Sequence, residues 1–340
     1  MKPPLTIIDI ARMANVSPSA VSIALNGRKG ISEPTRSRIL KIIEDVKYIP
    51  NQQARRLLLK YTNNIGILHE EHRSPLDHLF HVEITGAILN NCDDYGYNAV
   101  FTSIKTGKQP AIPEMIKNRD VDGIIIIGEL PLTIIGEIRK FGLPIVLVDE
   151  HFRIKDLPAV EPDYADGAEK AASYLLQCGH ERIAYIGESK YRRYGSQTLA
   201  GFRLAMKKAG KPVPDGYIQL GAGDSNADTG YTCMTAILGL KSKPTAVFCA
   251  ADIYAVGAMR SVKDMGLSIP EDVSIIGMDD ILLSEYVEPP LTTVKFNKRE
   301  MGTAALKTLT GLIKGELSGA EKLSFKGTIV PRRTVKKLGA

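Results

Sequence analysis

The feature that most constrains the fold is a pair of short helical segments joined by a tight turn at the start of the chain. Thr6 can cap the first segment, with Asp9 three residues later as the partner in a capping box. The segment stops at Asn15, a residue that tolerates the left-handed backbone of a tight turn. Ser17 and Pro18 then restart a helix at once, as its N-cap and first helical residue. Helix, short turn and helix is the helix-turn-helix pattern.

A third helical segment follows and can close a small core. The second segment ends at Asn26-Gly27, a pair typical of a helix C-cap and turn. The third begins at Ser32-Glu33-Pro34. Four apolar residues recur in it at helical spacing: Ile39, Leu40, Ile43 and Val46. We therefore expect a small three-helix head.

The positive charge of the chain is concentrated in this head and just after it. Residues 1–62 contain eleven lysines and arginines and four acidic residues, whereas the whole chain contains 44 basic and 38 acidic residues. The remainder therefore has 33 basic and 34 acidic residues and is almost neutral. A basic module on a neutral body is typical of a nucleic-acid-binding head. The alternative is a solvated basic surface without a partner.

The rest of the composition favours a cytoplasmic protein. No stretch approaches the roughly 18 apolar residues that cross a bilayer, and no N-terminal apolar run follows the first methionine. The four cysteines are scattered and form no Cys-x-x-Cys pair. We expect reduced thiols in the cytoplasm, which argues against a secreted solute-binding protein.

From Asn64 onward the pattern changes to alternating strands and helices. Short apolar runs predict parallel strands at residues 65–68, 98–101, 123–127, 144–148, 182–186, 217–220, 246–249 and 273–276. Helices are expected near residues 79–95, 111–119, 132–141, 164–178, 197–209, 226–239 and 253–265. Two consecutive blocks of this kind predict an α/β body of two doubly wound lobes with a cleft between them.

Several runs of residues resemble one known family. Thr6–Ser22, Ala24–Gly27 and Ser32–Arg36 are similar to the headpiece of the lactose-repressor/purine-repressor (LacI-type) family of transcriptional regulators, and Tyr48–Leu57 is similar to its hinge. The resemblance continues in the body and so covers nearly the whole chain. The matching runs there are Val121–Ile124, Gly179–Gly187, Pro244–Phe248, Pro270–Asp280 and Pro290–Val294.

The resemblance implies three parts. A helix-turn-helix head covers residues 1–49, a hinge helix and linker covers 50–63, and a two-lobed body similar to periplasmic sugar-binding proteins covers 64–340. The first lobe would take about 64–161 and 292–324, and the second 162–291 and 325–340. The crossings between them would fall near Glu161–Tyr164, Pro290–Phe296 and Phe325–Ile329. The chain ends soon after the last crossing, without the extra C-terminal helix of tetrameric members. We therefore expect a homodimer on a palindromic operator.

The second helix of the head is expected to enter the major groove of double-stranded DNA, because the N-terminal residues of a recognition helix reach base edges. Base contacts are expected from Pro18, Ser19, Ala20, Ser22 and Ile23. Family members commonly have a basic residue at the position of Ile23, and isoleucine can press on a thymine methyl group but cannot bind guanine as arginine does. Phosphate contacts are expected from Asn26, Arg28, Thr35 and Arg36. Thr6 and Ser17, which begin the first two helices, complete this DNA-binding set.

The hinge has two interpretations. Asn51, Ala54, Arg55 and Leu57 lie in a stretch that can form only about two helical turns, which is marginal in isolation. It could be a linker whose leucines dock on the body. Alternatively, Leu57 enters a minor-groove step while arginines hold phosphates, and the helix forms only on DNA. Because the family has a leucine at the position of Leu57, we favour the wedge.

The cleft is expected to bind a small effector, a sugar or sugar derivative. Asp163 and Asp279 match positions that bind sugar or purine ligands in relatives. Carboxylates suit polyhydroxyl ligands because each accepts two donors in a fixed geometry. Phe80 could stack on a sugar face together with Tyr191 and Tyr194, although Phe80 is equally compatible with the core.

Two positions in the cleft depart from the family pattern. Thr198 stands where many members have an arginine that clamps the ligand. Ala251 stands where asparagine is usual. Asp252, which follows it, either points into the cleft or caps the next helix. The identity of the effector therefore cannot be transferred from relatives.

Four of the six histidines lie close together in the sequence: His69, His72, His78 and His81. They follow the first strand of the body and are expected at the mouth of the cleft. A metal-binding or pH-sensing role competes with the interpretation that they are exposed loop residues. His69-Glu-Glu-His72 is not the His-Glu-x-x-His zinc motif, because its histidines are three residues apart. We expect no metal site and no cofactor.

Together these features predict a DNA-binding transcriptional regulator, a repressor of a carbohydrate-utilisation operon that a sugar-like effector controls. The alternative is a constitutive architectural DNA binder with a degenerate effector pocket. A sugar-processing enzyme with a fused head is less consistent with the sequence, which has no Walker A motif and no Gly-x-Ser-x-Gly elbow. Whether the effector induces or corepresses stays open.

Overall fold

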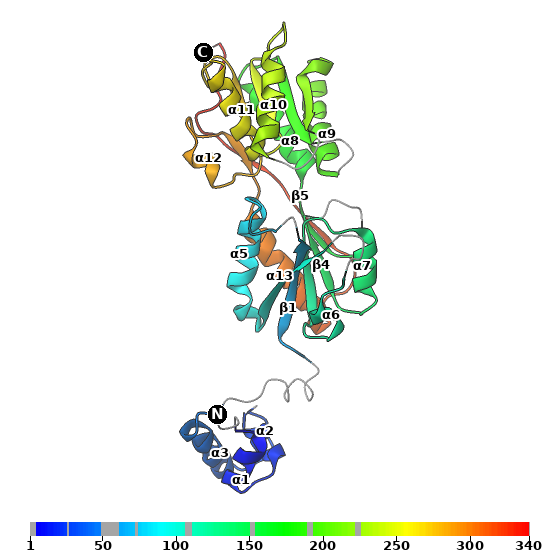
Figure 1. The fold of residues 1–340 in the computed structure, drawn as a ribbon, viewed down its shortest axis with the longest axis vertical. Helices are drawn as coiled ribbons and strands as arrows, with labels where there is room; N and C mark the ends of the chain where they lie inside the picture. The colour runs from blue at the N-terminus through cyan, green and yellow to red at the C-terminus, as the bar shows by residue number, and fades with distance from the viewer. Residues whose placement is uncertain are drawn as a thin grey trace. The chain divides into compact units, whose positions relative to one another are not determined.

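The computed structural model describes residues 5–25, 27–48, 61–71, 74–105, 111–149, 154–188, 193–221 and 226–339 (Figure 1). The chain divides into two compact units, Met1–Thr62 and Asn63–Ala340. We call the described part of the first unit the head and the second unit the body.

The head contains the three predicted helices, α1 (Ile7–Ala14), α2 (Pro18–Leu25) and α3 (Glu33–Asp45). Thr6 and Asp9 form the expected capping box at the start of α1, and Asn15 ends that helix in the left-handed conformation. The Ser17 hydroxyl accepts from the Ala20 amide, 3.2 Å away, and so begins α2. The core of the head contains Ile10, Ala11, Ala14, Val21, Ala24, Ile39 and Tyr48.

One residue expected in this core is not there. Leu40 is 42% exposed, whereas Ile39 beside it is fully buried. Ile43 and Val46 are partly buried and pack against the core. Successive residues of a helix point about 100° apart, so Ile39 and Leu40 cannot both face a core this small. The prediction for Leu40 was therefore wrong.

The first lobe of the body is built on a six-stranded sheet with the order β11-β5-β4-β3-β1-β2. All of its strand pairs are parallel. The strands are β1 (Asn64–Glu70), β2 (Asn98–Ile104), β3 (Gly123–Ile127), β4 (Ile145–Val148), β5 (Ala159–Pro162) and β11 (Lys322–Phe325). The central strand β3 is an apolar run buried on both faces, as a parallel sheet covered by helices requires.

Helices cover both faces of this sheet (Figure 1). α5 (His81–Asn91) and α13 (Lys298–Lys314) pack side by side on one face, and α6 (Glu114–Lys117) and α7 (Leu132–Arg139) cover the other. A short 3₁₀ turn, η1 (Asp93–Tyr95), follows α5. α5 and α13 approach closely at Gly302, where a Cβ atom would lie 2.4 Å from the carbonyl oxygen of Ile84.

The second lobe is built on a parallel four-stranded sheet with the order β7-β6-β8-β9. Its strands are β6 (Ile183–Glu188), β7 (Ile218–Gly221), β8 (Ala246–Cys249) and β9 (Ser274–Ile276). α8 (Tyr164–Gln177) and α9 (Arg193–Lys208) pack on one face, and α10 (Ala227–Leu238) and α11 (Asp252–Asp264) pack on the other. Two shorter elements are η2 (Asp215–Tyr217) and α12 (Leu283–Tyr286). The predicted class, two doubly wound lobes, is confirmed.

The segments expected to cross between the lobes contain strands that the sequence did not reveal. β10 (Thr293–Lys295) and β12 (Thr328–Val330) pair as a short antiparallel ribbon. β5 belongs to the sheet of the first lobe, and the next helix, α8, belongs to the second. After β12 the chain returns to the second lobe, where the Thr334 hydroxyl donates to the Ile275 carbonyl oxygen over 2.6 Å. The long helix α13 was also missed.

Two further observations concern membrane-spanning helices and the cysteines. No helix among the described residues is both long and apolar enough to cross a membrane. All four cysteines, Cys92, Cys178, Cys233 and Cys249, are buried free thiols. Burial raises the pKa of the Cys92 thiol to about 11, with a further contribution from the neighbouring Asp93 carboxylate, so this thiol is unreactive at neutral pH.

Candidate functional site

The N-terminal turn of α2 presents a small polar surface. Ser17, Pro18 and Ser19 are exposed, and Ala20, Ser22 and Ile23 are half-buried. No acidic residue lies in this first turn. A DNA phosphate or base edge could therefore approach without like-charge repulsion. Val21 and Ala24, on the opposite side of the helix, are core residues.

Arg36 occupies a different place from the phosphate contact that the sequence predicted. Its guanidinium lies 3.4 and 3.3 Å from the carbonyl oxygens of Ile23 and Ala24 and also donates to the Arg28 carbonyl. The side chain is only 16% exposed. Arg36 thus satisfies the carbonyl groups that the end of α2 leaves without a helical partner. It fixes α2 on α3 instead of reaching outward.

The other predicted phosphate contacts differ in their surroundings. Arg28 is exposed. The Thr35 hydroxyl is half-buried and shares a 2.8 Å hydrogen bond with Ser32. Thr6 is exposed, and its hydroxyl donates to Asp9 within the capping box, which lowers the pKa of that carboxyl. Seven residues named in the predictions lie outside the described residues: Asn26, Asn51, Ala54, Arg55, Leu57, His72 and Tyr191.

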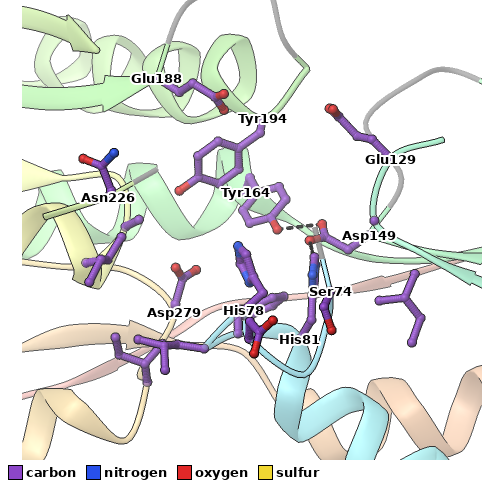
Figure 2. Close-up of a pocket in the computed structure, with 18 of the residues that line it drawn as sticks. Ser74, His78, His81, Glu129, Asp149, Tyr164, Glu188, Tyr194, Asn226 and Asp279 are labelled. Carbon is purple, nitrogen blue, oxygen red and sulfur yellow. Dashed lines mark hydrogen bonds and ion pairs between the residues drawn. The ribbon is translucent and has the colours of Figure 1, made fainter. Parts of the chain in front are cut away.

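The body contains a cavity of about 480 Å³ that residues of both lobes line. Its walls come from the carboxyl ends of parallel strands and the helices that follow them, the usual ligand site of open α/β sheets. Phe80 and His81 at the start of α5 line the cavity from the first lobe, and Tyr194 of α9 and Asp279 after β9 line it from the second. Figure 2 shows His81, Tyr194 and Asp279 around the cavity.

A buried chain of hydrogen bonds joins the two lobes in this cavity. His81 Nε2 lies 2.7 Å from one carboxylate oxygen of Asp149, and the Tyr164 hydroxyl donates to the other over 2.6 Å (Figure 2). Asp149 follows β4 of the first lobe, whereas Tyr164 begins α8 of the second. Burial, and then the charge of Asp149, raise the pKa of Tyr164, so its hydroxyl stays a donor. A ligand in the cavity would meet this bridge directly.

Aromatic rings form a wall beside the bridge. Tyr164 and Tyr194 meet edge to face with ring centroids 4.6 Å apart. The Tyr194 hydroxyl donates to the Ala250 carbonyl oxygen. Phe80 is 2% exposed and packs edge to face on Phe296, so it serves the core and lines the cavity at once. Such a wall could stack on the apolar face of a sugar ring.

Asp279 projects into the cavity from a largely buried position with an uncommon backbone conformation. Its residue is 9% exposed, and its backbone has a positive φ of 119°. Among the described residues no donor makes a hydrogen bond to its carboxylate, which points into the cavity in Figure 2. Burial raises the pKa of this carboxyl well above 3.8, the nearby Asp252 and Asp149 carboxylates raise it further, and Lys298 opposes them.

We expect Asp279→Asn to stabilise the unliganded body by about 1–2 kcal/mol at pH 7, because the amide removes a buried charge without a hydrogen-bonding donor. The folded carboxyl has a higher pKa than the unfolded one. The wild type therefore loses stability as the pH rises from about 4 through the folded pKa, and the amide does not. Thermal unfolding between pH 4 and 8 measures this. A gain that does not shrink toward pH 4 contradicts the prediction.

Three residues expected in the effector site do not line the cavity. Asp252 is fully buried, and its carboxylate accepts from the Ile281 amide and the Ser284 hydroxyl at 3.0 and 2.7 Å and from the Thr293 hydroxyl. It neither points into the cleft nor caps α11. Thr198 and Asp163 also make hydrogen bonds within the protein.

Thr198 is fully buried within α9, where its hydroxyl lies 2.8 Å from that of Tyr185 and donates to the Tyr194 carbonyl oxygen. Asp163 caps α8, and its side chain accepts from the Asp166 amide over 3.1 Å. Of the six residues expected to contact the effector, the structure therefore brings together Phe80, Tyr194 and Asp279.

The histidines were expected to be exposed in a loop, but two of them are not exposed. His69 and His81 are buried, at 5% and 8% exposure. His78 is exposed, stacks on His81 with centroids 4.3 Å apart and lines the cavity. Within the described ranges no three histidine, cysteine or acidic side chains are placed to hold a metal ion. His81 thus belongs to the bridge between the lobes, and the expectation of exposure was wrong for it and for His69.

Four residues that line the cavity were not predicted as site residues: His81, Asp149, Tyr164 and Glu188. A signal was available for two of them. Asp149 directly follows the apolar strand β4, and Glu188 ends the buried strand β6. Polar residues at the carboxyl ends of buried parallel strands point toward the ligand crevice.

Comparison with known proteins gives matches to both units. A model of bacterial regulatory proteins of the lacI family matches residues 6–51, and a model of a periplasmic binding protein-like domain matches residues 172–335. The HTH-type transcriptional repressor PurR of Pectobacterium atrosepticum is 32% identical over 335 residues, which cover 97% of this chain and 96% of that protein. PurR of Escherichia coli O139:H28 matches with the same identity and coverage.

Solved structures agree. The lac repressor dimer bound to operator and the anti-inducer ONPF has a TM-score of 0.82 at 25% identity, over 98% of this chain and 99% of that one. A complex of the transcriptional regulator CelR with cellobiose has a TM-score of 0.72 at 24% identity, over 97% and 100%, and so shows the shared fold.

Proposed function

Because the chain belongs to the lacI family of bacterial regulatory proteins, we propose that it is a sequence-specific transcriptional repressor whose operator affinity is set by a small polyhydroxyl effector. DNA binding and repression follow from the family, and the effector class is our inference. The observation that carries this inference is the cavity between the lobes, which combines carboxylates with an aromatic wall. Carboxylates accept paired hydroxyl donors, and aromatic rings pack on sugar faces.

On DNA, the protein acts as a homodimer with two heads on the half-sites of a palindromic operator. The support is the dimer named for the lac repressor, together with the exposed polar turn of α2. Ser17, Pro18 and Ser19 approach base edges, with Ile23 behind them. The residues matching the family hinge, including Asn51, Ala54, Arg55 and Leu57, bend the centre of the operator by minor-groove insertion. Such a regulator works in the cytoplasm, where the DNA is.

The effector acts by changing the balance between two arrangements of the lobes. Asp149 and Tyr164 come from different lobes and are joined by one hydrogen bond, so a ligand that competes for either group changes how the lobes are held. It alters operator affinity only as far as it binds the two arrangements differently. Induction and corepression both fit this scheme. We propose that the regulated genes serve carbohydrate utilisation.

Recovery of bound genomic DNA tests the regulator function. The purified full-length protein is incubated with fragmented genomic DNA, and the bound pieces are sequenced. We expect enrichment of one short palindrome, because a dimer with two equivalent heads reads two-fold-related half-sites. Genes beside the enriched sites would nominate the effector. Recovery of DNA without a shared motif would instead identify an architectural DNA binder.

A further inference from the structure

The described lining of the cavity is strongly one-sided in charge. Six carboxylates line it: Glu71, Asp77, Glu129, Asp149, Glu188 and Asp279. Within the described part of the lining there is no lysine or arginine. Low-dielectric walls of one charge sign concentrate ligands of the opposite sign. Glu71 already has an ion pair with Lys105 over 3.6 Å, and both oxygens of Asp149 are engaged by His81 and Tyr164, so a cationic group of a ligand is expected at Asp279.

The most specific observation is the environment of Asp279. It is nine-tenths buried, its carboxylate points into the cavity, and no described residue makes a hydrogen bond to that carboxylate (Figure 2). A buried carboxylate without a donor is expensive to keep charged. A donor supplied by a ligand would remove this penalty.

Lys298, a described cation near Asp279, already has other partners. The ammonium group of Lys298, which is 3% exposed, lies 2.9 Å and 2.6 Å from the backbone oxygens of Asp279 and Asp280 and 2.7 Å from the Glu83 carboxylate. An ammonium group has three protons to donate, and these three acceptors use all of them. Lys298 therefore holds the backbone of the Asp279 loop and does not pair with the Asp279 side chain.

Aromatic groups near Asp279 also suit a cation. Tyr194 lines the same cavity as Asp279, as Figure 2 shows. Burial, and then the charge of Asp279, raise the pKa of the Tyr194 hydroxyl. Tyr164 contacts Tyr194 edge to face. A ligand ammonium beside such rings gains electrostatic attraction from their faces in addition to the carboxylate contact.

We propose that the effector carries a protonated amine that binds Asp279, on a hydroxyl-bearing ring whose other groups meet the remaining carboxylates and the aromatic wall. This is the chemistry of an amino sugar. The inference rests on the proposed effector function and narrows it. The raised pKa of Asp279 agrees, since a cation placed beside the carboxylate would stabilise its charged form.

A matched panel of sugars tests the proposal by thermal shift of the full-length protein. The probes are glucose, glucosamine and glucose 6-phosphate, and galactose, galactosamine and galactose 6-phosphate. Members of each set differ in one group, so the contrast isolates charge. We expect an amine member to raise Tm more than its neutral partner and the phosphate to have no effect. Asp279→Asn should lower the affinity of the protein for the amine-bearing sugar at least tenfold.

Asp94→Asn is the matched control, since it also removes one carboxylate but from an exposed position outside the cavity, and its affinity should stay within about twofold of wild type. A neutral or phosphorylated sugar that binds as well as the amine overturns the proposal and leaves the effector function standing. A panel in which no member binds overturns the amino-sugar assignment. Operator binding by the same preparation reports separately whether the DNA-binding function is intact.

Discussion

Arg36→Ala is expected to lower operator affinity strongly while the body stays folded and able to bind its effector. The guanidinium joins α3 to the end of α2 through the carbonyl oxygens of Ile23, Ala24 and Arg28. Hydrogen bonds from a charged donor contribute about 1.5–3 kcal/mol each where they are buried, so partial exposure suggests a total loss of about 2–4 kcal/mol. A unit as small as the head has a total stability of only about 3–9 kcal/mol.

If Arg36 stabilises the head, its removal should change both the stability of the head and its DNA binding, whereas removal of a phosphate contact should change DNA binding alone. Calorimetry of the full-length protein should show a lowered transition for the head and an unchanged one for the body. Binding to operator and to unrelated DNA should both fall, because an unfolded head presents no recognition helix. Arg38→Ala is the matched control: Arg38 lies on the same helix and is exposed, so its loss should reduce affinity modestly and leave the head transition in place.

A phosphate contact by Arg36 would give a different result. If Arg36→Ala melts like the wild type but binds DNA more weakly with a smaller salt dependence, the residue contacts phosphate, as its sequence position suggested. Lysine is not expected to rescue the variant, because an ammonium group cannot replace the planar fork of donors that reaches several carbonyl groups.

Local chemistry explains which parts of the fold the sequence predicted. Thr6 with Asp9, Asn15, and Ser17 with Pro18 are caps whose partners lie within four residues, and the structure confirms them. The buried strands β3 and β8 are continuous apolar runs, and both were located to the residue. Caps and apolar runs depend on residues close in the sequence, so they can be recognised without knowledge of the tertiary structure.

Elements that depend on distant partners were missed. β10 and β12 have three residues each and exist because they pair with each other across the junction of the lobes. β5 and β11 pair over more than 150 residues of sequence and contain few apolar residues. The helix α13 was not predicted, although the resemblance assigned residues 292–324 to the first lobe, where the buried face of α13 packs.

The same limit applies to the candidate site. His81 and Asp149 are 68 residues apart and were not associated by any local pattern. Thr198 was expected in the site because many family members have a ligand-clamping arginine at its position, and Asp252 because it could point into the cleft. In this chain both side chains make their hydrogen bonds within the protein. A position in a family pattern locates a side chain near a cleft but does not say which way it turns.

Asp252 and Asp279 provide the sharpest test of that distinction, since both carboxylates were candidates for contact with the effector. Asp252→Ala should destabilise the body by about 3–5 kcal/mol. It leaves the Ile281 amide and the hydroxyls of Ser284 and Thr293 without their acceptor inside a fully buried site. Asp252→Asn should recover part of the loss, because the amide keeps one oxygen that accepts hydrogen bonds.

Asp279→Ala should leave the stability of the body unchanged or raise it, so that the body unfolds at the wild-type urea concentration or above it. Operator binding should persist, but no effector should change it. Lys298 holds the backbone of this loop, so the side chain can be removed without releasing the loop. Urea unfolding of both alanine variants, followed by operator binding with and without ligand, separates the two roles. If Asp252→Ala proves as stable as Asp279→Ala and also loses its ligand response, Asp252 turns into the cavity when ligand binds, and its buried hydrogen bonds describe only the unliganded state.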